Sequence, residues 1–136
     1  MKVSVRLARR FWPVIIASSL LSSCHHSSSP DHPRIAPGVT MQDVTFYSPA
    51  LARQMPYRVF FPTNLPPTEK LPVVYLLHGG GGDYRSWSND SDVSLYALKG
   101  LILVMPDGDE SYFMNEVESP REKYEDYITK DLLNAV

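Results

Sequence analysis

The segment from Leu71 to Gly82 constrains the fold of this chain more than any other part of its sequence. Residues 72–77 form a continuous apolar run, and His78 and four consecutive glycines follow it directly. An apolar run without alternation is typical of a strand that is covered on both faces in a mostly parallel sheet. The sequence therefore predicts a buried strand that delivers a glycine-rich loop to the carboxyl edge of such a sheet.

Other segments extend this strand into an α/β fold. Leu101–Met105 is equally apolar, and residues 91–99 predict a short helix that Gly100 ends, which completes a strand-helix-strand crossover. Val44–Tyr47 and Tyr57–Phe61 are short and rich in β-branched and aromatic residues, so we expect antiparallel strands at a sheet edge. The pattern indicates an α/β fold with a mostly parallel sheet.

The end of the chain predicts a helix over residues 120–136. Ser119 is suited to cap it, Pro120 fits the first helical position, and Glu122 completes a capping box. Apolar side chains then recur at helical spacing and form one stripe: Tyr124, Tyr127, Ile128, Leu132, Ala135 and Val136.

The first 24 residues have the pattern of an export signal. Residues 1–10 carry four basic side chains and no acid, residues 11–21 are mostly apolar, and Leu-Ser-Ser-Cys ends at Cys24, the only cysteine. An apolar run this short does not span a bilayer, which takes roughly 20 residues. The motif resembles a bacterial lipobox, which implies a lipid-anchored protein of the cell envelope, on its periplasmic or surface side. A plain secretory signal with an incidental cysteine is the alternative.

Residues 25–40 are rich in serine, proline and histidine, and they predict an extended tether ahead of a domain over 41–136. His25, His26 and His32 suggest a metal tract, but no carboxylate or thiolate lies at a useful spacing, which favours a solvated linker. Beyond residue 24, 9 basic and 15 acidic side chains give a formal net charge of −6. This balance argues against nucleic acid as a partner.

The glycine-rich loop predicts a site for acyl transfer. Hydrolysis of an ester needs donors aimed at the oxygen that becomes negative in the tetrahedral intermediate, and backbone amides of glycines supply them without obstruction. A flexible surface loop is the structural alternative. Phosphate binding is disfavoured because the Gly-Lys-Ser/Thr ending of the Walker motif is absent.

Three motifs in order resemble the esterase D-type branch of the α/β-hydrolases, which includes S-formylglutathione hydrolases, tributyrin and feruloyl esterases, and mycolyltransferases. They are residues 78–87 (HGGGGDYRSW), 103–108 (LVMPDG) and 124–132 (YEDYITKDL). The resemblance covers residues 44–136. It implies an oxyanion donor at the amide of Gly80, supported by His78, Gly79 and Gly81, and a substrate pocket that involves Trp87, Tyr112 and Asn115. No cofactor is implied.

The same resemblance implies that this chain holds only the N-terminal part of the α/β-hydrolase fold, a three-layer α/β/α arrangement around a mostly parallel sheet. No Gly-x-Ser-x-Gly elbow follows Gly82, so the serine, the acid and the catalytic histidine are expected beyond Val136. We expect His78 to fix the loop through a ring-nitrogen hydrogen bond, because the triad histidine comes last in this fold. The whole protein would cleave a small-molecule, glycan or lipid ester, or a thioester, through an acyl-serine intermediate. The alternative is a non-catalytic surface lipoprotein with a binding role or none.

A calcium loop is a further alternative for the acidic segment that starts at Asp107. Asp107, Asp109, Ser111, Asn115 and Glu118 fall at EF-hand ligand positions, but a tyrosine occupies the position where the turn needs glycine. A strand also precedes this loop where an EF-hand has a helix. The preferred interpretation is an acidic active-site loop without a metal.

Overall fold

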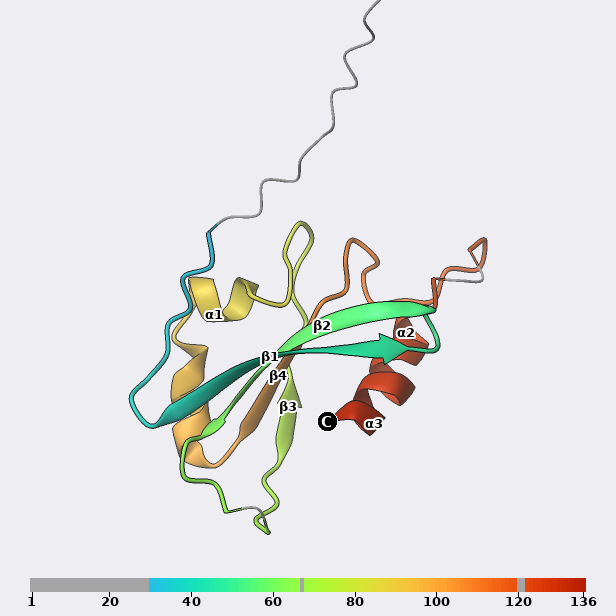
Figure 1. The fold of residues 1–136 in the computed structure, drawn as a ribbon. Coiled ribbons are helices and arrows are strands. Elements are labelled where there is room, and N and C mark those ends of the chain that lie inside the picture. The colour runs from blue at the N-terminus through green and yellow to red at the C-terminus, as the bar shows by residue number, and fades with distance from the viewer. Residues whose placement is uncertain (1–29, 67, 120–121) are drawn as a thin grey trace, which may run out of the picture.

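The computed structural model describes residues 30–66, 68–119 and 122–136. A four-stranded mixed sheet forms its centre, in the order β1-β2-β4-β3 (Figure 1). The strands are β1 (Val39–Ser48), β2 (Arg53–Pro62), β3 (Val73–Tyr75) and β4 (Ile102–Pro106). The β1-β2 and β2-β4 pairs are antiparallel and the β3-β4 pair is parallel. The predicted edge hairpin is confirmed, and it is longer than its apolar cores suggested.

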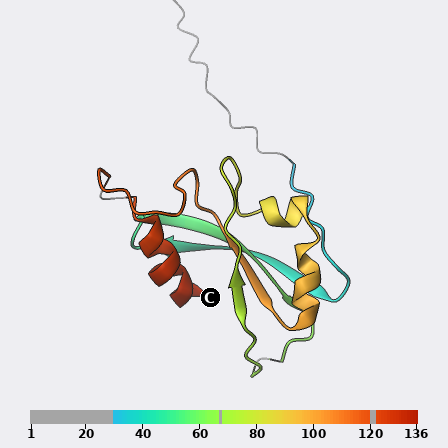
Figure 2. The same ribbon diagram turned by 180° about the vertical axis from the view of Figure 1, so that it is seen from behind.

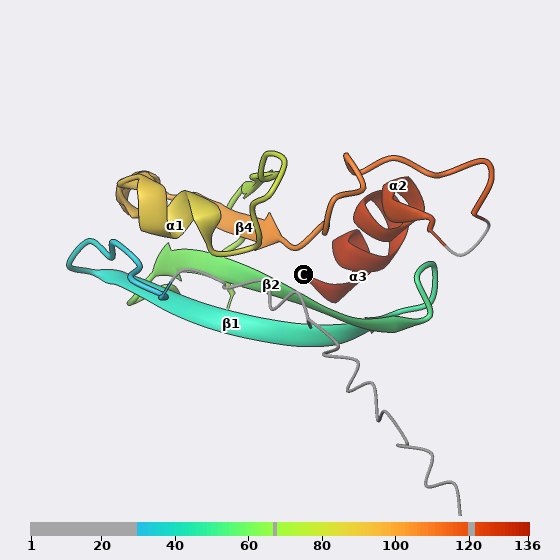
Figure 3. The same cartoon turned by 90° about the horizontal axis from the view of Figure 1, so that it is seen from above.

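Side chains of β2 and β4 alternate between two hydrophobic cores, as the period of a strand requires. On one face, Tyr57, Val59 and Val104 pack with the C-terminal helix. On the other face, Phe60 and Leu103 pack with the helical turns that follow β3. Helices therefore cover both faces of the sheet. Figure 3 shows them near opposite ends of the β1-β2 hairpin. The structure confirms the three-layer α/β architecture.

The crossover between β3 and β4 is confirmed. It contains α1 (Ser86–Asp90) and the 3-10 helix η1 (Val93–Lys99), and Gly100 ends η1 in the left-handed region at φ 79°. The prediction that the first apolar run is covered on both faces is wrong for β3, which has three residues, with Val73 and Val74 exposed. β4 pairs with one side of β3, and no described strand pairs with the other side (Figure 2).

The C-terminal helix is confirmed, but its beginning differs from the prediction. It runs through α2 (Tyr124–Asp126), the π-helix η2 (Tyr127–Leu132) and α3 (Leu133–Ala135). Pro120 and Arg121 lie outside the described residues, and Glu122 is not helical, so the capping box is not formed. The side-chain oxygen of Asn115 instead accepts hydrogen bonds from the backbone amides of Glu125 and Asp126, at 3.0 and 3.3 Å. A residue remote in sequence caps this helix.

The N-terminal part of the described chain packs on the domain. Arg58 is fully buried in β2, and its guanidinium donates to both carboxylate oxygens of Asp31 at 3.0 and 2.8 Å. The same group also donates to Asp43 and to Ser88. The predicted tether over 25–40 is therefore corrected from Asp31 onward, because its polar groups find partners in the domain, and β1 already begins at Val39.

The predicted signal of residues 1–24, with Cys24, and the first tether residues 25–29 lie outside the described residues. Within the part of the chain that the structure describes, no helix has the length and apolar character needed to cross a membrane.

The bond between Asp31 and Arg58 should make the stability of the wild type depend on pH. The hydrogen bond from Arg58 lowers the pKa of Asp31 below its ordinary value of 3.8. A lowered pKa in the folded state contributes stability above the ordinary pKa, and this contribution is lost as pH falls through the folded value. Urea titrations should therefore show wild type more stable than Asp31→Asn at pH 6. The difference should shrink below pH about 3.8, and a difference that is constant with pH would contradict this assignment.

Candidate active site

A buried histidine joins the two loops at the carboxyl ends of β3 and β4. The Nε2 atom of His78 accepts a hydrogen bond from the backbone amide of Gly108 at 3.0 Å. Its Nδ1 lies 2.9 Å from the carbonyl oxygen of Gly79, which can only accept, so Nδ1 carries the proton and the ring is neutral. The ring hydrogen bond predicted from the sequence is confirmed. This ring joins the two loops, which lie side by side at this edge of the sheet (Figures 1 and 2).

Three of the four amides of the glycine loop have no acceptor in the described part of the chain. Among the described residues, no acceptor is bonded to the backbone N–H of Gly79, Gly80 or Gly81, whereas Gly82 donates to the carbonyl of Gly79 at 3.1 Å. An added Cβ at Gly79 or Gly80 would meet no atom within 4 Å. Packing within the described chain therefore does not require glycine at these two positions. An open cradle of backbone donors is what an oxyanion site needs.

The loop after β4 has a strained backbone that ionic contacts hold in place. Asp109, Tyr112 and Phe113 all have positive φ angles of 47–57°, which non-glycine residues rarely adopt. The Tyr124 hydroxyl donates to Asp109 Oδ2 at 2.5 Å, and the Arg53 guanidinium bonds to both groups. Burial raises the pKa of Tyr124, and the Asp109 carboxylate raises it further. Tyr124 is thus a neutral donor that fixes this loop to the helix.

Asp107 lies beside the histidine but serves the loop backbone. Burial raises its pKa above the ordinary value. Its Oδ1 accepts the amide of Asp109 at 2.9 Å and lies 3.9 Å from Nε2 of His78. This carboxylate therefore stabilises the backbone of the loop after β4. No group of three His, Cys, Asp or Glu side chains in the described ranges could hold a metal ion.

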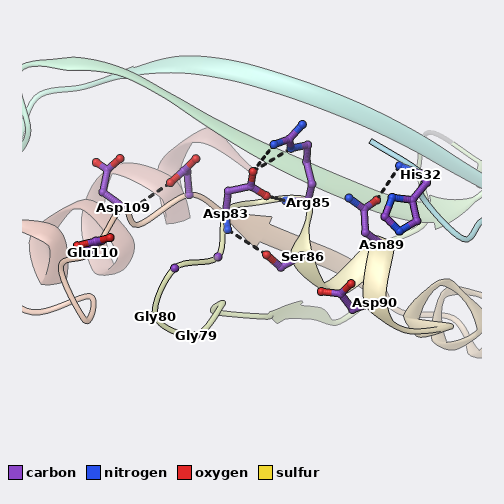
Figure 4. Close-up of a pocket in the computed structure, with 13 residues that line it drawn as sticks. His32, Gly79, Gly80, Asp83, Arg85, Ser86, Asn89, Asp90, Asp109 and Glu110 are labelled. Carbon is purple, nitrogen blue, oxygen red and sulfur yellow. Dashed lines mark hydrogen bonds and ion pairs between the residues drawn. The ribbon is translucent and has the colours of Figure 1, made fainter. Parts of the chain in front are cut away.

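Two cavities flank the glycine loop. The larger cavity, of about 820 Å³, opens between the glycine loop, α1, the N-terminal segment and the loop after β4 (Figure 4). Its lining consists of His32, Gly79, Gly80, Gly81, Gly82, Asp83, Arg85, Ser86, Asn89, Asp90, Asp107, Asp109 and Glu110. The smaller cavity, of about 410 Å³, is lined by His78, Gly79, Gly80, Gly81, Asp109, Glu110, Tyr112 and Phe113. A reacting group on the glycine loop would therefore have space on both sides.

The structure brings some of the predicted site residues together and separates others. His78, Gly79, Gly80 and Gly81 form the loop itself, and Tyr112 lines the smaller cavity with 85% of its surface exposed. Trp87 lines neither cavity, because its indole N–H bonds to the carbonyl of Leu77 at 2.9 Å and its ring faces a hollow beside η1. Asn115 is also absent from both linings, since its carboxamide caps the C-terminal helix.

Gly108 should be required for the packing of this site. A Cβ built on Gly108 would lie 2.2 Å from the ring of Phe113, whose own ring centroid lies 5.1 Å from that of His78. We expect Gly108→Ala to lower the free energy of unfolding by about 1–3 kcal/mol, as overpacking does. Urea denaturation measures the change, with Gly79→Ala as the matched control because its Cβ meets open space. Equal stability of the two variants would contradict the packing described here.

Comparisons with known proteins bear on the family and the fold of this chain. The family model described as "Putative esterase" matches residues 48–136. Among solved structures, an S-formylglutathione hydrolase of Agrobacterium tumefaciens superposes with a TM-score of 0.63 at 19% identity, over 76% of this chain and 45% of its own. The fluorophosphonate-binding serine hydrolase F of Staphylococcus aureus gives 0.61 at 21% identity, over 71% and 40%. A ferulic acid esterase of Anaeromyces mucronatus gives 0.55 at 19%, over 79% and 47%.

These structural likenesses establish a shared fold. The chain spans less than half the length of each of the three solved structures.

Proposed function

Because this chain belongs to the esterase family whose model matches residues 48–136, we propose that the protein hydrolyses carboxylic esters or thioesters through an acyl-serine intermediate. In this proposal the described residues supply the oxyanion side of the active site. The serine, its histidine and its acid come from sequence beyond Val136. The ester would bind with its carbonyl oxygen on the glycine loop.

The free amide of Gly80 carries this proposal. When the serine Oγ attacks the ester carbonyl, the C=O bond opens and its oxygen becomes negative. A fixed N–H group that is not bonded elsewhere stabilises that oxygen without reorganisation. Gly80 offers such a donor at the carboxyl edge of the sheet, and His78 holds the loop through Gly108. The serine proton passes to the histidine and then to the leaving alcohol or thiol. Water then hydrolyses the acyl-serine bond, which releases the carboxylic acid product and restores the serine.

We also propose that the protein is exported and lipid-anchored through Cys24. The basic, apolar and Leu-Ser-Ser-Cys segments at the start of the sequence support this. An acyl chain contributes about 0.8 kcal/mol per buried methylene, so a cysteine carrying several chains would hold the protein at a membrane surface. Radiolabelled palmitate that is incorporated by wild type and not by Cys24→Ser would support the anchor. Equal labelling of both would contradict it.

Sequencing of the gene and an assay of the purified protein together test the proposed reaction. We expect the reading frame to continue past the codon for Val136 and to encode Gly-x-Ser-x-Gly, then an acid and a histidine. The purified protein should release p-nitrophenol from p-nitrophenyl acetate, and replacement of that serine by alanine should abolish the release. A stop codon after Val136, or hydrolysis that survives the serine replacement, would contradict the proposal.

A further inference from the structure

Residues 31–38, here called the docked segment, contribute to the larger cavity although they lie outside the matched residues 48–136. Figure 4 shows His32 and Asn89 at one end of this cavity, Asp109 and Glu110 at the other end, and Gly79 and Gly80 between them. A segment ahead of the family domain therefore faces the proposed reaction centre.

Arg58 holds the docked segment from inside the domain. Each of its five N–H donors has a partner: Nε bonds to Asp43, Nη1 to Asp31 and Ser88, and Nη2 to Asp31 and Asp43. The guanidinium also lies 5.7 Å from the ring centroid of Tyr84. A planar guanidinium whose N–H donors all form hydrogen bonds fixes the positions of the acceptors around it. The position of Asp31, and of the residue that follows it, is thereby set.

Backbone hydrogen bonds continue this docking along α1 and η1. The amide of His32 donates to the side chain of Asn89 at 3.2 Å, and that of Arg34 donates to the carbonyl of Ser88 at 2.8 Å. The amide of Ala36 donates to the Ser94 hydroxyl at 3.0 Å. Because α1 directly follows the glycine loop, these bonds hold the docked segment in a fixed place relative to that loop.

His32 lines the larger cavity, and its ring has one nitrogen that can accept a hydrogen bond. Its Nδ1 lies 2.7 Å from the carbonyl oxygen of Pro30, so Nδ1 carries the proton in this contact. In the neutral ring, Nε2 is then an acceptor, and it has no hydrogen-bond partner among the described residues. The only guanidinium in the cavity lining belongs to Arg85, and it bonds to Asp83. Apart from the unbonded amides of the glycine loop, this lining carries further acceptors, the carboxylates of Asp90 and Glu110.

We propose that His32 is a specificity-determining residue that accepts a hydrogen bond from the substrate. The group that enters the larger cavity would carry hydroxyl donors, while the smaller cavity, walled by Tyr112 and Phe113, takes the apolar group on the other side of the ester. This inference rests on the proposed esterase function. It assigns a substrate contact to a part of the chain that precedes the family domain.

Matched ester pairs test the assignment in the whole protein. Glycerol monoacetate and propyl acetate differ in the hydroxyls of the alcohol part, and ethyl lactate and ethyl propanoate differ in one hydroxyl of the acyl part. Titration of the released acid gives kcat/KM for each ester. Wild type should prefer the hydroxyl-bearing member of one pair by about three- to tenfold, the worth of one hydrogen bond.

Three variants separate the hydrogen bond from the docking. His32→Phe keeps a ring but removes the acceptor, and it should abolish the preference through KM with little change in kcat for propyl acetate. Asp31→Ala should abolish the preference and also raise hydrogen-exchange rates at the amides of His32, Arg34 and Ala36. Arg34→Ala is the control on the same segment, because its contact with Asp92 is 3.7 Å long and exposed, and it should behave as wild type.

The outcomes are distinguishable. Loss of the preference in His32→Phe with unchanged amide exchange supports the proposal, and Asp31→Glu should restore the preference that Asp31→Ala loses. If His32→Phe has the same ratio of kcat/KM as wild type within both ester pairs, the role of His32 is overturned. The esterase function would then stand. If wild type hydrolyses none of the four esters or p-nitrophenyl acetate, the proposed function fails, and the inference fails with it.

Discussion

Replacement of Gly80 by proline should lower kcat for p-nitrophenyl acetate by about 10²–10³, the loss expected when one oxyanion donor is removed. Proline has no backbone N–H, so the substitution removes the proposed hydrogen-bond donor to the oxyanion. KM should change little, because the donor acts on charge that develops only in the transition state. The rate of ester hydrolysis, measured at saturating substrate, provides the test.

Gly80→Ala is the matched control for this substitution. It adds a Cβ at the same place but keeps the N–H, and that Cβ would meet no atom of the described chain within 4 Å. The alanine variant should therefore lose much less activity than the proline variant, and its urea midpoint should equal that of wild type. Equal losses in both variants would mean that bulk on the loop, and not the missing donor, lowers the rate.

Replacement of Arg58 by alanine should lower the free energy of unfolding by about 3 kcal/mol. Removing one partner from a buried ionic network leaves the other charges without compensation, which typically costs about 3–5 kcal/mol. The lower end applies because the side chains of Asp31 and Asp43 are 36% and 40% exposed, so water can reach them. Chemical denaturation followed by circular dichroism measures the loss.

Arg34→Ala provides the comparison for Arg58→Ala. Arg34 also pairs with an aspartate, but its side chain is 53% exposed and that of Asp92 is 69% exposed. Exposed ion pairs contribute about 0–1 kcal/mol, so this variant should be close to wild type. Similar unfolding free energies for the two alanine variants would show that burial of Arg58 does not increase its contribution to stability.

The sequence was most informative where a local pattern and the tertiary structure agree. The apolar runs before His78 and before Asp107 both became strands, and Gly100 ended the intervening helical turn as its position predicted. Two loops at the carboxyl ends of neighbouring parallel strands must lie close together. The contact between His78 and Gly108 is therefore a consequence of topology that the sequence could indicate.

The features that sequence reasoning missed depend on partners distant in the chain. The residues from Asp31 onward have the composition of a linker, but the guanidinium of Arg58, 27 residues away, and bonds to α1 and η1 attach them to the domain. An arginine inside the apolar strand Tyr57–Phe61 was the available signal, because a charge there must have buried partners. Asn115, 10 residues before Glu125, likewise took the capping role that local spacing had assigned to Ser119.

Trp87 illustrates the same limit within the site. Its place soon after the glycine loop suggested a pocket wall, but the turn into α1 directs its indole N–H to the carbonyl of Leu77. Sequence distance from a functional loop does not determine which way a side chain faces. A role for Trp87, Asn115 or Tyr112 in binding the substrate stays a prediction.

Mass spectrometry after reaction with a fluorophosphonate probe tests the central claim most directly. We expect a single covalent adduct on the whole protein, located by peptide fragmentation at the serine of a Gly-x-Ser-x-Gly sequence beyond Val136. Gly80→Pro should slow formation of that adduct. The absence of any adduct, or an adduct on Ser86, Ser88 or Ser111, would contradict the assignment of this chain as the oxyanion side of a serine esterase.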